Sequence, residues 1–145
     1  ILPEGYFPQY KVVSREMDVL SSTLDFALID NGKLVDFDEL KTCYYTDFLN
    51  FQEYKDAEYD TYINFIKKEY KHNYEQVQQQ LYTSELKECN LVYLEVQYYD
   101  DDINRSRIIR EDEYIKFRIR RDDEVRNKIR GRSGIFQTIK DYFKN

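Results

Sequence analysis

The feature that most constrains the fold of this chain is the dipeptide Asn31-Gly32, which lies between two stretches of β-favouring sequence. Asn-Gly between apolar runs is the strongest short-range signal of a β-hairpin, because both residues adopt the positive φ angles that a tight turn requires. The sequence therefore predicts a strand from Ser22 to Asp30 and a return strand from Lys33 to about Thr42. Polar residues on these two strands are brought close together by such a hairpin.

The rest of the chain alternates between strand-like and helix-like periods. Alternating apolar residues predict strands at 10–13, 90–98 and within 107–120. A helical period predicts helices at 57–70, 73–86 and 122–143, the last of them interrupted at Gly131 and Gly134. Residues 44–56 are expected to form a loop or a short helix. This order favours one domain of the α+β class over residues 1–145, with the architecture of an α/β sandwich.

The charge of the chain is unevenly distributed. A net charge of −6 argues against general electrostatic adhesion to nucleic acid, yet nine of the ten arginines lie between Arg105 and Arg132. A cluster of this kind can give an acidic protein one basic face, which is the usual footprint of phosphate binding. The alternative is a solvated, ion-paired face, because acidic residues are interleaved with these arginines.

Cysteine and apolar content restrict the site chemistry and the compartment. Cys43 and Cys89 with the single His72 are too few for a zinc or iron–sulfur site. No run of eighteen apolar residues predicts a membrane span, and the first residues lack the features of a secretory signal. We therefore expect a protein of the cytoplasm or the nucleus that is not secreted. Because the chain begins at Ile1 without Met, we interpret it as the C-terminal core of a longer protein.

Acidic and basic residues occupy both predicted hairpin strands. Asp25 lies on the first strand, and Glu39 and Lys41 lie on the second, where a period of two gives them the same face. Phosphodiester hydrolysis needs an attacking water and a neutralised phosphate, and carboxylates that hold Mg²⁺ supply both. A neighbouring lysine steadies the nucleophile or the charge of the transition state. The alternative is an ordinary solvated strand face, since acid-x-Lys is common on strands.

The register of the hairpin decides whether the two acids meet. A straight hairpin closed at Asn31-Gly32 sets Asp25 opposite Asp38 and turns Glu39 away from it. One extra residue in the second strand would bring Asp25 and Glu39 to one face, and β-bulges are frequent beside active sites. We therefore expect a bulge between Phe37 and Glu39 or, failing that, Asp38 as the metal ligand.

A helix rich in glutamine completes a family resemblance. The stretches 23–26 (Thr-Leu-Asp-Phe), 39–42 (Glu-Leu-Lys-Thr) and 76–78 (Gln-Val-Gln) resemble, in order and spacing, three motifs of the lambda-exonuclease (YqaJ-like viral recombinase) family within the PD-(D/E)XK nuclease superfamily. The similarity continues through the closing strands, Asp122-Asp123-Glu124 and the last helix, and covers roughly residues 10–145. Phe26 departs from the family, which has Gly after the aspartate, and the spacing from aspartate to glutamate is longer.

The resemblance implies a restriction-endonuclease-like core, in which helices flank a central mixed β-sheet. It also implies a Mg²⁺ or Mn²⁺ site at Asp25, Glu39 and the Leu40 backbone carbonyl, with Lys41 as catalytic base or charge stabiliser. Gln76 would position the lysine or the water, and Gln78 is the next candidate. The residues expected to bind nucleic acid are Arg105, Arg107, Arg118 and Arg120.

The implied activity is that of a metal-dependent deoxyribonuclease, a 5′-to-3′ exonuclease of DNA recombination, repair or viral replication. Its implied partners are DNA, a single-strand annealing protein and further copies of the chain. Two alternatives remain open: a structure-selective endonuclease of the same fold, and an inactive nuclease fold that binds DNA or acts as a scaffold. Tyr44, Tyr45 and Phe48 follow the lysine strand and either stack on a frayed base or, as we favour, pack in the core.

Overall fold

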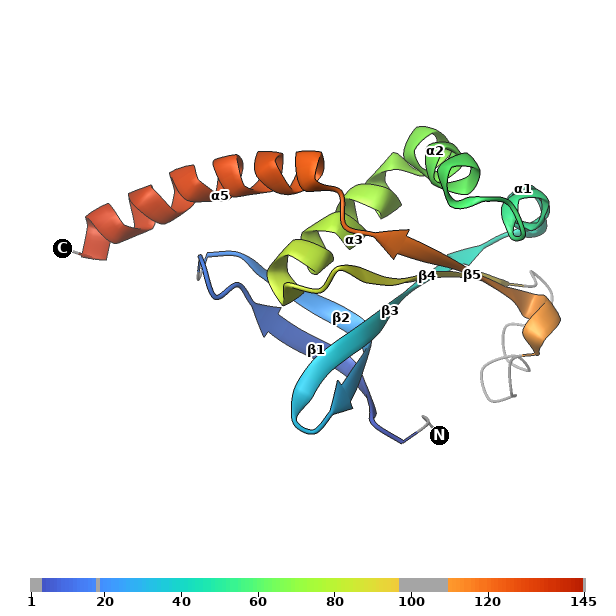
Figure 1. The fold of residues 1–145 in the computed structure, drawn as a ribbon, viewed down its shortest axis with the longest axis horizontal. Coiled ribbons are helices and arrows are strands. Elements are labelled where there is room, and N and C mark those ends of the chain that lie inside the picture. Colours follow the sequence, from blue (N-terminus) through green and yellow to red (C-terminus); the bar gives the residue numbers. More distant parts are fainter. Residues whose placement is uncertain (1–3, 18, 97–109, 145) are drawn as a thin grey trace.

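The computed structural model of the chain describes residues 4–17, 19–96 and 110–144. It has a five-stranded sheet in the order β1-β2-β3-β4-β5. The strands are β1 (Tyr6–Val13), β2 (Ser21–Asp30), β3 (Lys33–Cys43), β4 (Glu88–Glu95) and β5 (Tyr114–Arg120). The helices are α1 (Tyr45–Tyr54), α2 (Tyr59–Glu69), α3 (Lys71–Ser84), the short 3-10 helix η1 (Glu111–Glu113) and α5 (Asp123–Lys144). The predicted α+β class and mixed central sheet are confirmed (Figure 1).

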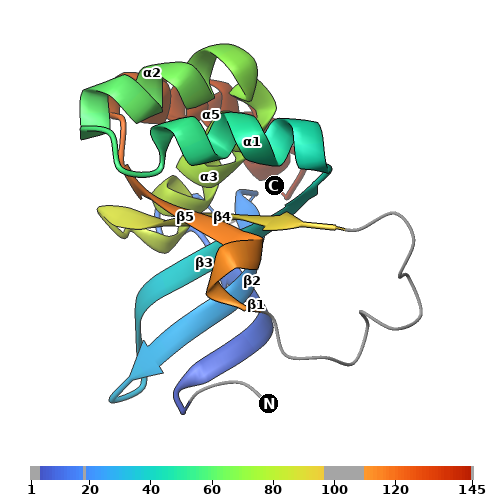
Figure 2. The ribbon, with the colours of Figure 1, turned by 90° about the vertical axis from the view of Figure 1, so that its right-hand side faces the viewer.

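The sheet is antiparallel except at its centre. β1, β2 and β3 form an antiparallel meander, β3 and β4 run parallel, and β5 returns antiparallel to β4. Parallel neighbours need a long crossover connection, and here it consists of α1, α2 and α3. Figure 2 shows these helices gathered with α5 on one side of the sheet, while the hairpin of β2 and β3 extends away from them. The crossover therefore brings α3 close to the middle strands.

The predicted hairpin turn is confirmed. Asn31 and Gly32 have φ angles of 50° and 75°, and Asp30 pairs with Lys33 across the turn. Positive φ at both central residues is the geometry that matches the right-handed twist of the flanking strands. The turn therefore closes the hairpin where the sequence predicts.

The hairpin contains a bulge, but not where the sequence analysis placed it. Ile29 pairs with Leu34, and the next pair is Leu28 with Asp36, so Val35 is the extra residue. The predicted position between Phe37 and Glu39 is wrong. Val35 is 44% exposed near the hairpin tip, where an additional residue disturbs no packing. Phe37 and Glu39 are buried beneath the helices, where a break in alternation would turn one of them out of the core.

The bulge changes the partners of the acidic residues. After Val35 the ladder pairs Asp38 with Phe26, so Asp38 does not stand opposite Asp25 as it would in a straight hairpin. The Asp25 carboxylate is near enough to Glu39 to raise the pKa of Glu39. The Asp38 carboxylate instead accepts a hydrogen bond of 2.8 Å from the Asn90 side-chain amide on β4. The assignment of Asp38 as a metal ligand depended on a straight hairpin, and the hairpin is not straight.

Aromatic rings fill the core between the sheet and the helices. The ring of Phe51 on α1 stacks on that of Tyr93 on β4 with centroids 3.7 Å apart, and Tyr54 stacks on Phe65 at 4.0 Å. Such pairs contribute about 0.5–1.5 kcal/mol each beyond the area that they bury. Phe48 is 2% exposed and lies in this core, as the core-packing interpretation predicts. The aromatic content of the chain thus holds α1 and α2 against the sheet.

Helices α1 and α5 differ in how well the sequence predicts them. The segment interpreted as a loop or a short helix forms α1. The interruption expected in the last helix is wrong, because α5 is continuous through Gly131 and Gly134. Glycine costs a helix about 1 kcal/mol relative to alanine without breaking it. No helix in the described ranges is long and apolar enough to cross a membrane.

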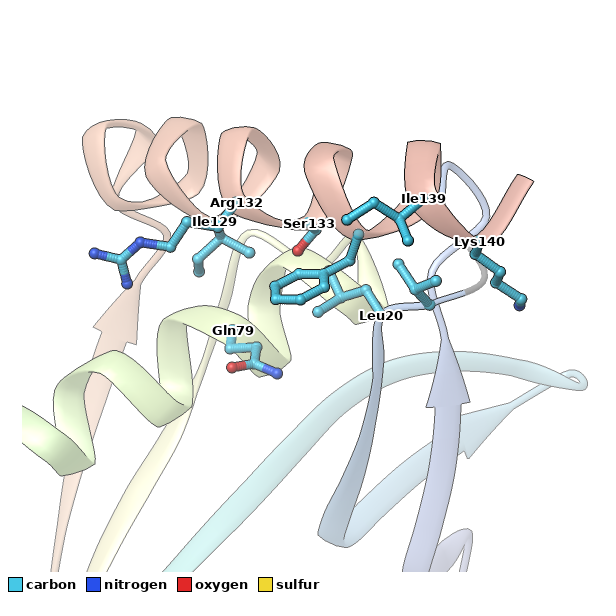
Figure 3. A pocket seen from close by; sticks show the side chains of 9 residues that line it. Leu20, Gln79, Ile129, Arg132, Ser133, Ile139 and Lys140 are labelled. Atoms are coloured by element: carbon cyan, nitrogen blue, oxygen red, sulfur yellow. The ribbon is translucent and has the colours of Figure 1, made fainter. Parts of the chain in front are cut away.

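Helix α5 rests on the rest of the molecule through a few contacts. The Asp122 carboxylate caps its start by accepting hydrogen bonds from the backbone amides of Glu124 and Val125. Further along, Gln137 accepts a hydrogen bond from the Val19 backbone, and Arg130 lies 2.8 Å from Glu16. An open hollow of about 550 Å³ remains beneath the helix (Figure 3), lined by Leu20, Gln79, Ile129, Arg132, Ser133 and Ile139, among others.

Candidate active site

The candidate site lies where α3 passes the middle strands. β2 contributes Asp25, β3 contributes Glu39 and Lys41, and α3 contributes two glutamines. Glu39 and Lys41 share the face of β3 that looks toward α3, because successive side chains of a strand alternate between its faces. The structure therefore brings together four of the predicted site residues, Asp25, Glu39, Lys41 and Gln76.

Glu39 is the most buried charged residue of the site, with 3% of its surface exposed. Its Oε1 accepts a hydrogen bond of 2.9 Å from the Gln76 amide, and its Oε2 accepts one of 2.7 Å from the Gln80 amide. Burial raises the pKa of Glu39 above its ordinary value; the Gln80 hydrogen bond lowers it, Asp25 raises it and Lys41 lowers it. The net direction of the pKa is upward, so the surroundings of Glu39 disfavour its charged form.

Lys41 is coupled to Glu39 through Gln76. The Lys41 ammonium donates a hydrogen bond of 2.6 Å to Gln76 Oε1, while Gln76 Nε2 donates to Glu39. The ammonium also lies 3.6 Å from Glu39 Oε1. These two hydrogen bonds fix the orientation of the Gln76 amide, because its oxygen must face the cation and its nitrogen the anion. Gln76 thus bridges Lys41 and Glu39, and its predicted role in positioning the lysine or the water stays a prediction.

Asp25 borders an open hollow of about 440 Å³, together with Phe26, Leu40 and Lys41. Its Oδ2 accepts a hydrogen bond of 2.9 Å from the Leu40 backbone amide. Its Oδ1 receives a longer contact of 3.4 Å from the Gln9 side chain. The Leu40 bond ties the Asp25 carboxylate to the middle of the acid-x-Lys motif. A ligand that enters this hollow meets Asp25 and Lys41 together.

The donor set fits a hard divalent cation. Within the described part of the chain, no group of three or more His, Cys, Asp or Glu side chains could hold a metal ion. Mg²⁺ keeps several waters and is commonly bound by one or two carboxylates together with substrate phosphates, so a Mg²⁺ site at Asp25 and Glu39 is compatible with this donor pair and stays a prediction. Each carboxylate oxygen has more than one acceptor position, so the glutamine hydrogen bonds leave Glu39 able to bind a cation. The Leu40 carbonyl as a third ligand stays a prediction.

Gln80 is a site residue that the sequence analysis missed. It follows Gln76 by four positions, and residues four apart lie on the same face of a helix. That spacing was the available signal. Gln78, the next candidate in the sequence analysis, points elsewhere: its amide donates to the Arg120 carbonyl and accepts from the Asp122 backbone amide. Gln78 therefore holds the junction between β5 and α5.

The predicted nucleic-acid-binding arginines fall into two groups. Arg105 and Arg107 lie outside the described residues. Arg118 Nη1 lies 2.9 Å from both oxygens of Asp36, and its Nη2 lies 3.0 Å from Glu88. The Arg120 guanidinium lies over the Tyr59 ring, 4.1 Å from its centroid. Both of these arginines have partners within the chain, and their contact with phosphate stays a prediction.

Tyr44, Tyr45 and His72 lie on the surface of the protein. Tyr44 and Tyr45 are 57% and 62% exposed just beyond the end of β3. The core packing that the sequence favoured is therefore wrong for Tyr44 and Tyr45, although it is confirmed for Phe48. The alternative, stacking on a substrate base, is untested. His72 is exposed at the start of α3, and it belongs to no metal-binding group in the described ranges.

No protein-family model matches the sequence, and no curated protein matches it. Solved structures do match. An alkaline exonuclease (LHK-Exo) from Laribacter hongkongensis aligns with a TM-score of 0.56 and 15% identity, over 96% of this chain and 60% of that chain. The chain shares its fold with an exonuclease. LHK-Exo in complex with dAMP aligns with a TM-score of 0.54 and 16% identity, over 92% of this chain and 56% of that chain. This chain therefore spans less than two thirds of either matched structure.

Proposed function

We propose that this chain is the catalytic core of a divalent-metal-dependent deoxyribonuclease. The observation that carries the proposal is the hydrogen-bonded set of Glu39, Gln76 and Lys41, of which Lys41 borders an open hollow together with Asp25. Two carboxylates and an amine within reach of one phosphate are what metal-assisted phosphodiester hydrolysis requires. The shared fold with an exonuclease supports this choice over other phosphoryl chemistries.

Each residue has a role in the proposed reaction. Asp25 and Glu39, with the Leu40 carbonyl, would hold Mg²⁺ or Mn²⁺, which supplies charge neutralisation at the phosphate and a more acidic bound water. Lys41 faces the same side as Glu39 and would steady the attacking water or the charge that develops on the phosphate. Gln76 would keep the amine at that place. The water oxygen attacks phosphorus and gives up a proton to the solvent, the bond to the leaving sugar oxygen breaks, and that oxygen takes a proton from the solvent.

We propose DNA as the substrate and exonucleolytic cleavage from a 5′ end as the mode. The polarity follows from the resemblance to the lambda-exonuclease family. A fold neighbour is described as an alkaline exonuclease and binds dAMP, a deoxynucleoside monophosphate of the kind that an exonuclease would release. The same proposal includes a role in recombination or viral replication, a single-strand annealing protein as partner, and assembly into oligomers.

A catalytically inactive DNA-binding subunit is the second candidate. The observation that favours it is the burial of Glu39, both of whose oxygens accept hydrogen bonds from glutamines within the protein. A cation would have to share this carboxylate with two amides. The inactive subunit would keep the fold and bind DNA without cleaving it.

Incubation with linear and circular duplex DNA separates the candidates. Each DNA is incubated with the protein and Mg²⁺ or Mn²⁺, with chelator as the control, and the products are resolved on a gel. Loss of linear DNA alone is the expected result, and label at one 5′ or 3′ end then gives the polarity. Nicking of circles would indicate an endonuclease instead. DNA that is bound but uncleaved under all conditions would favour the inactive subunit.

A further inference from the structure

Gln80 joins the two strands that carry the acidic residues. It is 2% exposed, and its Nε2 donates 2.7 Å to Glu39 Oε2 on β3 and 3.2 Å to the Thr23 carbonyl on β2. Thr23 lies two residues before Asp25 in the same strand. One amide group on α3 therefore connects the backbone beside Asp25 to the carboxylate of Glu39.

The orientation of the Gln80 amide is determined by these neighbours. Both contacts of Nε2 are to oxygen acceptors, and a rotation of the amide by 180° would place its own oxygen against a carboxylate. Two acceptors at hydrogen-bond distance with no proton between them repel each other. The amide nitrogen must therefore face Glu39 and Thr23.

This orientation has a cost. Gln80 Oε1 is buried and has no hydrogen-bond partner, and it is the one such side-chain atom among the described residues. A buried acceptor without a donor costs about 1–3 kcal/mol. Gln78, two positions away and 1% exposed, uses both ends of its amide in hydrogen bonds. Helix α3 thus holds two buried glutamines. Both polar ends of the Gln78 amide form hydrogen bonds, whereas Gln80 donates to Glu39 while its own amide oxygen has no donor.

We infer that Gln80 is a positioning residue, which sets the Glu39 carboxylate relative to Asp25 so that the pair can bind one divalent cation. The inference rests on the proposed metal-dependent function. Gln80 does not touch the cation or the substrate in this scheme, since its amide nitrogen faces Glu39 from the side of α3. Residues that orient metal ligands in this way typically change metal affinity or activity 10–100-fold when they are replaced.

The test is Mn²⁺ binding to the whole 145-residue chain, measured by electron paramagnetic resonance of free Mn²⁺. Gln80→Met keeps the length and volume of the side chain and removes the amide. We expect its Mn²⁺ dissociation constant to rise about 10-fold or more. With linear DNA at saturating Mn²⁺, we expect kcat to fall while KM for DNA changes little, because no DNA contact is removed.

The matched control is Gln78→Met, which makes the same change at an equally buried position of the same helix. It removes hydrogen bonds to the Arg120 and Asp122 backbone and should lower the midpoint of urea unfolding. Its Mn²⁺ affinity should stay within about twofold of the unsubstituted chain, since it does not contact Glu39. A general loosening of α3 would instead weaken Mn²⁺ binding in both variants.

A second variant protects the test against misfolding. Gln80→Asn keeps an amide but withdraws it by one methylene, and it should also weaken Mn²⁺ binding. Unchanged affinity in every folded Gln80 variant, while Glu39→Gln abolishes binding, would overturn the inference and leave the proposed function standing. Equal weakening in Gln78→Met would overturn it as well. Failure of the unsubstituted chain to bind Mn²⁺, or binding unaffected by Glu39→Gln, would overturn the proposed metal site together with the inference.

Discussion

Helices α3 and α5 are both polar on average, yet the fold treats them in opposite ways. α3 buries seven residues, among them Gln78 and Gln80, whereas α5 buries none. Apolar side chains of α5 lie largely in solvent: Ile135 64%, Phe136 65%, Tyr142 77% and Phe143 80% exposed. Amides are thus buried in one helix while aromatic rings are exposed in the other.

The reason lies in the connections of the two helices. α3 is the last part of the crossover between the parallel strands β3 and β4, so both of its ends are held close to the sheet. α5 follows the edge strand β5, and its C-terminal end extends past the sheet (Figure 1). Further contacts to the helix, such as those of Arg130 and Gln137, come from the segment around Glu16 and Val19. Position in the topology, rather than polarity, decides which helix contributes to the core and to the candidate site.

The largest expected effect is on the stability of the α3 side. Leu81 on α3 is fully buried, so Leu81→Ala removes packed methyl groups and leaves a cavity. We expect the free energy of unfolding to fall by about 2–5 kcal/mol. Urea unfolding followed by circular dichroism measures this loss. If the free energy of unfolding fell by less than about 1 kcal/mol, α3 would not be packed against the core as described.

The second prediction concerns the rate of DNA cleavage at the face of β3 that is directed toward α3. Lys41→Ala removes the amine beside Glu39 and should lower kcat on linear DNA at least about 100-fold, the range typical of a lost acid–base group. Binding to DNA with chelator present should persist. Lys116→Ala, the same change at an exposed position of β5, is the control and should keep kcat within a few-fold. Cleavage that survives Lys41→Ala would remove Lys41 from the proposed site.

A third prediction addresses the junction where the two helices meet. The Tyr74 hydroxyl on α3 donates a hydrogen bond of 2.7 Å to Asp122, which caps α5. Burial alone would raise the pKa of Asp122, but the Tyr74 hydrogen bond, the backbone amides of Val125 and Glu124, and Lys67 together hold it below its ordinary value. Tyr74→Phe should lower the free energy of unfolding by about 1 kcal/mol at pH 7.

The destabilisation by Tyr74→Phe should depend on pH, because the folded-state pKa of Asp122 is lowered. A lowered pKa in the folded state stabilises the protein at pH values above the ordinary aspartate pKa, and this stabilisation is lost as the pH falls through the folded value. The difference between Tyr74→Phe and the unsubstituted chain should therefore shrink in acid, below about pH 4. Urea unfolding at a series of pH values measures it. A difference that grows in acid would contradict the assigned pKa direction.

The smallest expected effect is on α5. Ile135 is 64% exposed, and alanine is the better helix former, so Ile135→Ala should change the free energy of unfolding by no more than about 0.5 kcal/mol. Paired with Leu81→Ala, it compares two aliphatic truncations in two helices of one chain. A loss of several kcal/mol would show that Ile135 is covered in solution, and the contrast between the helices would then fail.

The hairpin and the shared face of Glu39 and Lys41 could be predicted from local sequence patterns. The Asn31-Gly32 turn depends on the φ angles that these two residues accept, and the shared face of Glu39 and Lys41 depends on strand periodicity alone. Gln76 followed from a family resemblance. The bulge at Val35 could not be located, because an extra residue is tolerated wherever packing permits it, and the packing comes from distant helices.

The sequence by itself determined the hairpin, the acid-x-Lys face and the glutamine helix, since each depends on neighbours along the chain. Only the tertiary structure decided that Gln80 contacts Glu39 together with Gln76, and that Asp38 pairs with Phe26 rather than with Asp25. It also decided that the apolar face of α5 stays exposed. These outcomes depend on the crossover that carries α3 to the middle strands, and on burial that no local pattern records.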